Sequence, residues 1–224
     1  MLTELAPDLF VTERALRFGG LNIGTRMTVV RLAGGELFLH SPVSLDSELR
    51  RELEGVGKVR FVVAPNKMHH LFAGVYKEAW PDAELYCAPG LEEKRADISW
   101  HTSLGDRAPA AWSGQLGQVL FEGFPVANEV VFFHPPTRTL VVTDLAFHIG
   151  EESPALTRLG FRLLGAYKNF GPTVMERILI RDRAAARASL ERILAWDFER
   201  VIVAHGSVLA KGGREALRKG YEWL

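Results

Sequence analysis

The sequence predicts an α/β sandwich in which two sheets face each other and helices cover their outer sides. Strand-rich segments alternate with helical segments twice along the chain. Two of the strands are near-continuous apolar runs, Val59–Val63 and Arg200–Ala204, as is typical of strands buried on both faces. No stretch rich in Pro, Gly or Ser separates the two halves, so we expect one domain over residues 1–224.

The first half is predicted to hold several strands and two helices. Gly34 and Gly35 lie between two β-rich runs, which indicates a hairpin. Ser44 is the expected N-cap of the first helix. A turn at Pro65 and Asn66 leads into the second helix, which we expect to run to about Trp80. The predicted strands are Leu9–Val11, Met27–Leu32, Glu36–His40, Val59–Val63 and Glu84–Cys87, and the first helix is Leu45–Glu54.

The second half repeats this pattern with different lengths. Pro135–Arg138 reads as a hairpin turn, and a helical region from Ser153 to about Ile180 is broken near Gly171 and Pro172. The predicted strands are Gln118–Phe121, Glu129–Phe133, Thr139–Val142 and Arg200–Ala204, and the later helices are Arg183–Ala195 and Gly213–Leu224.

Composition excludes several classes of protein. Hydrophobic residues make up 47% and charged residues 24% of the 224 residues, as in an ordinary globular protein. Lys and Arg number 27, as do Asp and Glu, so no excess of cations favours nucleic acid as a partner. Cys87 is the single cysteine, which excludes an internal disulfide and a thiolate-rich zinc site.

The chain also lacks the sequence features of membrane insertion and export. Its longest apolar stretches are far shorter than the roughly 20 residues that cross a bilayer. Its N-terminus has neither the basic start nor the apolar run of a signal peptide. We therefore expect a cytoplasmic protein that binds no membrane and whose partner is a small-molecule substrate or ligand.

Four potential metal ligands follow buried strands. His69 and His70 come after Val59–Val63, His205 comes directly after Arg200–Ala204, and Asp144 follows the strand at residues 139–142. The carboxyl ends of strands in α/β sheets are where sites recur. A single histidine after a strand is usually a hydrogen-bonded or capping residue, but four candidate ligands in equivalent places favour one shared site.

The phrases around these residues resemble a known family. Val62–Gly74, Leu140–Asp144 and Ile202–Gly206 are similar to segments of the metallo-β-lactamase superfamily, in which a buried strand ends in H-x-H-x-D-H. There a later hairpin carries a bridging Asp, and a last strand ends in His followed by Gly. The resemblance covers about residues 9–210 and implies a metallo-β-lactamase-like αββα sandwich of two mixed sheets. The segment Ala64–His70 is similar to a branch described only as a domain of unknown function, DUF4336.

The resemblance implies a damaged metal site. Placing His70 on the final His of H-x-H-x-D-H puts His69 on the Asp, Lys67 on the second His and Pro65 on the first. Pro125 is then the best match to a third His. Asp144 matches the bridging Asp and His205 the last His. In the family the first three His hold one metal, so this chain is expected to have lost that metal's ligands.

The resemblance further implies one metal at the second position, held by His69, His70, Asp144 and His205. Zinc is the expected cation, and iron or manganese with added waters would also suit three imidazoles and a carboxylate. Asp144 is expected to hold the cation or to orient a water. Lys67, which has no lone pair when charged, is expected to point at the vacated first position as a cation facing Asp144.

Two functions follow from these expectations. The first is a metal-dependent hydrolase of an ester, thioester, lactone or phosphoester. The second is a non-catalytic member of the fold that binds a small molecule or a partner, with Lys67 in place of the metal charge. The fold by itself does not choose between them.

Overall fold

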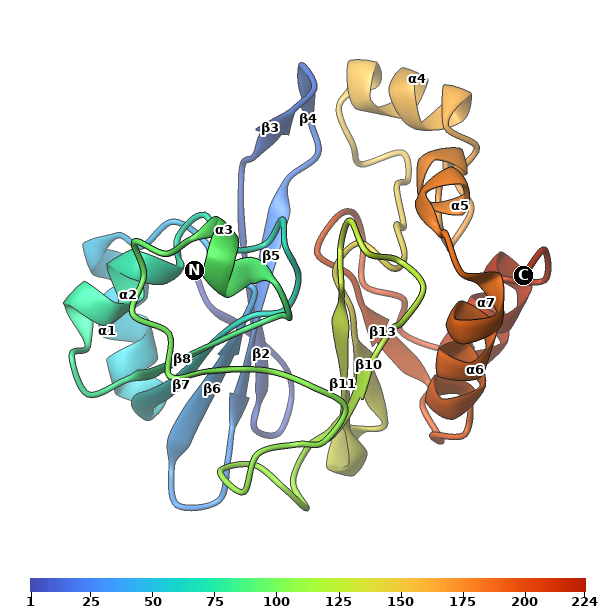
Figure 1. The fold of residues 1–224 in the computed structure, drawn as a ribbon. Coiled ribbons are helices and arrows are strands. Elements are labelled where there is room, and N and C mark those ends of the chain that lie inside the picture. Colours follow the sequence, from blue (N-terminus) through green and yellow to red (C-terminus); the bar gives the residue numbers. More distant parts are fainter.

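The computed structural model describes residues 1–224 and contains two facing sheets (Figure 1). The larger sheet has seven strands in the order β1-β2-β5-β6-β7-β8-β9. Neighbouring strands from β1 through β6 in this order pair antiparallel, and neighbouring strands from β6 through β9 pair parallel. Its strands are β1 Thr3–Ala6, β2 Leu9–Arg14, β5 Thr25–Arg31, β6 Glu36–His40, β7 Lys58–Ala64, β8 Glu84–Cys87 and β9 Thr102–Ser103.

The second sheet has four strands in the order β10-β11-β12-β13, with β12 and β13 parallel. A separate small hairpin, β3 with β4, projects from one end of the molecule (Figure 1). These strands are β10 Gly117–Leu120, β11 Val130–His134, β12 Thr139–Val141, β13 Arg200–Ile202, β3 Arg17–Phe18 and β4 Leu21–Asn22.

Helices cover the outer face of each sheet, so the predicted αββα sandwich is confirmed. Helices α1 and α2 pack on the larger sheet and α6 and α7 on the smaller one (Figure 1). The α-helices are α1 Ser47–Val56, α2 Ala73–Ala79, α3 Leu91–Lys94, α4 Ala155–Leu163, α5 Val174–Leu179, α6 Arg183–Leu194 and α7 Gly213–Gly220, and a 3-10 turn covers Pro135–Thr137.

The layer between the sheets is rich in aromatic side chains. Phe38 of β6 meets Phe132 of β11 edge to face, and the rings of Phe61 and Tyr86 contact that of Trp112. Burial of such rings contributes both apolar area and specific geometry. This layer holds the sheets in one relative position, which matters because the candidate site draws residues from both.

Several predicted helix boundaries differ from the structure, and the last helix, α7, ends at Gly220 instead of Leu224. Asp46, not Ser44, caps α1, because its carboxylate accepts the backbone N–H of Leu49. Helix α2 begins only at Ala73, since residues 66–72 form a turn. The helical region after residue 153 splits into α4 and α5 around a non-helical stretch that includes the predicted break at Gly171.

The strand order places several loops at one edge of the sandwich. The loops after β6, β7, β12 and β13 leave the carboxyl ends of strands in parallel pairs, and β5, which is antiparallel to β6, begins at the same edge. None of the helices combines the length and the hydrophobicity that a transmembrane span requires.

Candidate functional site

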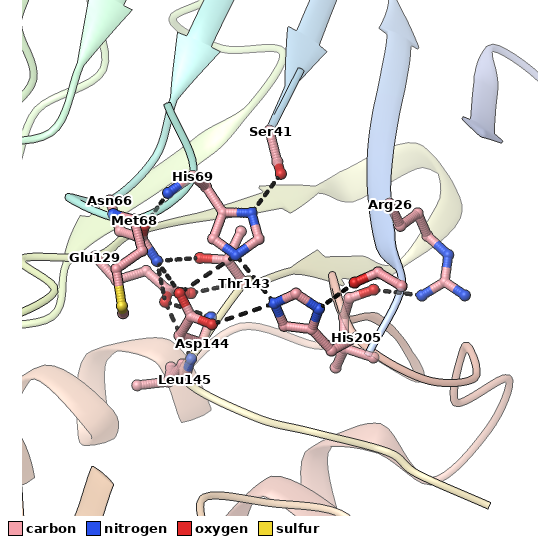
Figure 2. A network of polar contacts seen from close by, with 12 residues as sticks. Arg26, Ser41, Asn66, Met68, His69, Glu129, Thr143, Asp144, Leu145 and His205 are labelled. Carbon is pink, nitrogen blue, oxygen red and sulfur yellow. Dashed lines mark hydrogen bonds and ion pairs between the residues drawn. The ribbon is translucent and has the colours of Figure 1, made fainter. Parts of the chain in front are cut away.

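Three of the predicted ligands meet at this edge (Figure 2). His69 lies in the turn after β7, Asp144 follows β12 and His205 follows β13. The Nε2 atoms of His69 and His205 are 3.2 Å apart. Asp144 places Oδ2 3.3 Å from His69 Nε2 and Oδ1 3.5 Å from His205 Nε2. All three side chains are buried. We call them the triad.

The spacing of the triad fits a tetrahedral cation. A cation with bonds of roughly 2.0–2.2 Å to nitrogen and oxygen holds its ligand atoms about 3.3–3.6 Å apart when the geometry is tetrahedral. The two Nε2 atoms at 3.2 Å and the His69 Nε2–Asp144 Oδ2 pair at 3.3 Å lie in or next to this range, and the 3.5 Å contact of His205 is with the other oxygen of Asp144, Oδ1. One ligand atom from each of the three residues lies within 4.8 Å of the others. Two imidazoles and one carboxylate also form a donor set that catalytic zinc and non-haem iron sites use.

Hydrogen bonds on the far side of each imidazole orient the triad. Nδ1 of His205 lies 2.7 Å from the carbonyl oxygen of Gly24 and must donate to it. The Nε2 of neutral His205 is therefore the lone-pair nitrogen that faces Asp144. Nδ1 of His69 lies 2.7 Å from the hydroxyl of Ser41, which accepts or donates. His69 is thereby able to present either tautomer.

Asn66 fixes both the turn that carries His69 and the carboxylate of Asp144. Its side-chain oxygen accepts the backbone N–H groups of Met68 and His69, both at 2.8 Å. Its amide nitrogen donates to Asp144 Oδ2 at 2.6 Å and to the hydroxyl of Thr143 at 2.8 Å. Asn66 therefore both forms the predicted turn and holds the carboxylate of the triad.

Glu129 is a buried acid behind the triad. Its carboxylate accepts the backbone N–H groups of Thr143, Asp144 and Leu145 at 2.6–3.0 Å, which fixes the backbone that carries Asp144. Burial and the neighbouring Asp144 raise the pKa of Glu129 to about 7, against the backbone donors that lower it.

The triad itself keeps Asp144 ionised. Burial favours the neutral carboxyl, but the positive charge and the hydrogen bonds that His69 and His205 supply when protonated outweigh it and hold the pKa of Asp144 well below its usual range. A deprotonated carboxylate is the form that binds a cation.

His70 does not join the triad, contrary to the expectation. Its Nδ1 lies 2.9 Å from the guanidinium of Arg95. Burial, followed by the charges of Lys94 and Arg95, lowers the pKa of His70 to about 4. Adjacent residues in the tight turn direct their side chains differently, and only His69 faces Asp144.

The expected approach of Lys67 to Asp144 is also wrong. The Lys67 ammonium donates to the carbonyl oxygen of Pro125 at 3.3 Å and lies against Gly90. It makes no ion pair with Asp144, whose oxygens are already served by Asn66 and the two triad imidazoles.

A cavity of about 600 Å³ opens onto the triad. All three triad side chains contribute to its lining, and 14 of its 24 lining residues are hydrophobic. The rest of its wall comes from the β3–β4 hairpin, the turn at residues 68–72 and the region of α4 and α5.

Solved structures with the same architecture share this arrangement of sheets and helices. The DIM-1 metallo-β-lactamase exposed to ceftazidime matches with a TM-score of 0.69 over 100% of this chain and 96% of that chain, at 15% sequence identity. The chain has the metallo-β-lactamase fold. FIM-1 from Pseudomonas aeruginosa in its mono-zinc form matches the same fold with a TM-score of 0.65, 11% identity and coverage of 100% and 95%.

Other comparisons extend this result. The Flv1 flavodiiron core from Synechocystis, metal soaked, matches with a TM-score of 0.66 and 14% identity over 100% of this chain and 60% of that chain. The family model described as a domain of unknown function, DUF4336, matches residues 8–91. No curated protein matches the sequence.

The triad corrects the alignment to the metallo-β-lactamase motif by one residue. His69, rather than His70, occupies the place of the final His in H-x-H-x-D-H, because it is the histidine that meets Asp144 and His205. Met68 then falls on the Asp, Asn66 on the second His and Ala64 on the first.

Sequence reasoning missed three residues that shape the site. Glu129 carried a signal, since a lone acid before the apolar run Val130–Phe133 is unusual in a buried strand. Ser41 and Arg26 carried none, because their contacts with the His69 ring and with the loop of His205 depend on tertiary structure.

Proposed function

We propose that this protein is a hydrolase that uses one divalent cation held by His69, Asp144 and His205. The observation that carries the proposal is the convergence of two imidazoles and one carboxylate: the two Nε2 atoms are 3.2 Å apart, and the two oxygens of Asp144 lie 3.3 Å from His69 Nε2 and 3.5 Å from His205 Nε2. The hydrogen bonds from His205 to Gly24 and between His69 and Ser41 support it, since metal-binding histidines characteristically use the second ring nitrogen in this way.

Zinc is the cation we propose, with iron or manganese as the alternatives. Among proteins of this fold, one similar structure is a metallo-β-lactamase in a mono-zinc form. When bound, such a cation polarises a carbonyl or phosphoryl oxygen and acidifies water.

The chain's own residues would orient the reactants. Asn66 holds Oδ2 of Asp144, while Oδ1 faces His205 and receives no amide bond. The ring of Phe147 stacks on that of His205 and shields it from water. In the reaction, the water oxygen bonds to the acyl carbon or phosphorus. The bond to the leaving oxygen or sulfur breaks with its electron pair on the leaving atom, which takes a proton from the water.

The position of Lys67 argues against the non-catalytic alternative in the form predicted from the sequence. It required the Lys67 ammonium to replace the metal charge beside Asp144, and that ammonium instead contacts the Pro125 carbonyl. What remains of the alternative is a binding protein whose cavity takes a ligand without metal.

The adjacent His69 and His70 allow a direct test of the proposed metal site. Tag-free protein is titrated with Zn²⁺, Fe²⁺ and Mn²⁺ by calorimetry, and bound metal is counted by mass spectrometry. We expect one cation per chain, lost in the His69→Ala and His205→Ala variants. His70→Ala and Lys67→Met are the matched controls and should change the dissociation constant less than threefold.

Activity is then measured with ester, thioester, lactone and phosphoester substrates on loaded protein. Turnover should require the cation and disappear with His205→Ala. Absence of metal in the native protein, or retention of stoichiometric metal in His69→Ala, would contradict the assignment.

A further inference from the structure

The walls of the cavity above the triad are mostly hydrophobic. Aliphatic and aromatic side chains come from four separate parts of the chain: the β3–β4 region, the turn after β7, the loop before β11 and the segments of α4 and α5. Representative wall residues are Ile23, Phe72, Phe124, Phe161, Leu164 and Leu179. The volume of about 600 Å³ is that of a small-molecule site.

Of the charged side chains in the wall outside the triad, the exposed Arg17 has no hydrogen-bond or ion-pair partner, and the others have partners already. Lys94 donates to the backbone carbonyl of Lys67, and Glu176 accepts from Thr173 in the cap of α5. His70 is engaged by Arg95. The wall therefore offers a ligand one unpaired cation, Arg17, and the triad is the buried polar end of a mostly hydrophobic cavity.

The mouth of the cavity exposes large apolar groups. Phe18 is 71%, Leu71 56%, Met175 48% and Val126 44% exposed, and all four line the cavity. Clustered apolar exposure of this kind marks ligand grooves in folded proteins. It extends the apolar surface outwards from the triad along the direction in which a bound molecule would leave.

We propose that this cavity binds the hydrocarbon chain of an acyl ester or thioester, with the acyl carbonyl at the triad. The proposal rests on the function proposed above and narrows its substrate class. A molecule with one polar end and a long apolar remainder matches the distribution of polar groups in the cavity. A phosphoester fits less well, because anionic oxygens require several free cationic donors.

Chain-length dependence tests the cavity without any metal. Protein in EDTA is titrated by calorimetry with the neutral alcohols 1-butanol, 1-hexanol and 1-octanol. Each buried methylene should tighten binding roughly threefold to fourfold, the equivalent of about 0.8 kcal/mol. Affinity that does not change with chain length would overturn the proposal.

Helix α5 supplies a matched pair of variants. Met175 lines the cavity and Ile178 does not, although both are exposed on the same short helix, at 48% and 65%. Met175→Glu should weaken 1-octanol binding at least tenfold, while Ile178→Glu should stay within twofold of the native protein. Equal effects of the two would contradict the location. Val126→Glu repeats the test on another part of the wall should Met175→Glu disturb α5, as monitored by circular dichroism.

The orientation of the bound hydrocarbon chain is tested by comparing the affinities of a neutral and an anionic ligand. In EDTA, octanoate should bind more weakly than 1-octanol, because its carboxylate would face ionised Asp144. Saturating zinc should reverse this order. An unchanged order in protein shown to hold zinc would place the polar end elsewhere and overturn the orientation. If no metal binds at all but the chain-length series holds, the hydrolase proposal fails and the hydrocarbon site stands.

Discussion

Arg26 holds the backbone on both sides of His205. Its buried guanidinium reaches from β5 to the loop after β13, where it donates to the carbonyl oxygen of Val203 and, at 2.6 Å, to that of Gly206 (Figure 2). Glu13 pairs with the same guanidinium from the neighbouring strand β2. His205 is thus fixed by β5 through Arg26 as well as through the Gly24 carbonyl.

Replacing Arg26 by Met should lower the free energy of unfolding by roughly 2–4 kcal/mol, since two backbone carbonyls near the triad lose charged donors. Arg31→Met is the control on the same strand, because the Arg31–Asp8 pair is exposed and should contribute about 1 kcal/mol or less. Urea unfolding of metal-free protein measures both. Equal losses of unfolding free energy in the two variants would show that the bonds to Val203 and Gly206 contribute no more than the exposed Arg31–Asp8 pair.

Ser41 should matter to the cation through its hydroxyl alone. Ser41→Ala removes the partner of His69 Nδ1 and should weaken cation binding roughly tenfold to a hundredfold. Ser41→Gly should weaken it equally, yet yield the more stable protein of the two, because residue 41 has φ +59°, where glycine is unstrained. Calorimetric titration with zinc and thermal unfolding report the two quantities separately. Native affinity in the glycine variant would refute the role of the hydroxyl.

His40 should make the protein sensitive to acid. Its side chain is buried against Phe132, its Nε2 has no hydrogen-bond partner, and burial followed by the charge of His69 lowers its pKa to about 3. The unfolded chain binds a proton at this histidine below about pH 6.5, while the folded chain does not until about pH 3. Stability from this group is therefore present above pH 6.5 and is lost as the pH falls through that window.

His40→Leu should abolish this loss. Between about pH 7 and about pH 4, native protein in EDTA should lose roughly 3 kcal/mol more unfolding free energy than the variant. The exposed His101, replaced by Leu, is the control and should leave the native slope in place. Parallel pH profiles for native protein and His40→Leu would rule out the effect.

The sequence predicted the positions of the strands better than the directions in which side chains of the following turns point. Apolar runs located β7 and β13 and therefore the loops that carry His69 and His205, because buried strands need continuous apolar residues. Which of His69 and His70 faces Asp144 was not readable, since it depends on how the Asn66 side chain captures the N–H groups of the turn. Lys67 was misplaced for the same reason.

Long-range polar contacts were also not predictable from the sequence. Glu129 is explained only by the backbone N–H groups of residues 143–145, which approach it from the loop after β12. The β3–β4 hairpin, of two residues a side, was too short to leave a periodic pattern, although it forms part of the cavity wall.

The triad draws its members from both layers of the sandwich, with His69 from the larger sheet and Asp144 and His205 from the smaller one. A cation held by all three would therefore link the two layers. It would bind only the folded chain, because only the fold brings the three ligands together. Free cation at a hundred times its dissociation constant would add about 2.7 kcal/mol to the work of pulling the layers apart. If the triad holds that ion as proposed, the lifetime of the protein against proteases would follow the supply of the ion, whether or not substrate is present.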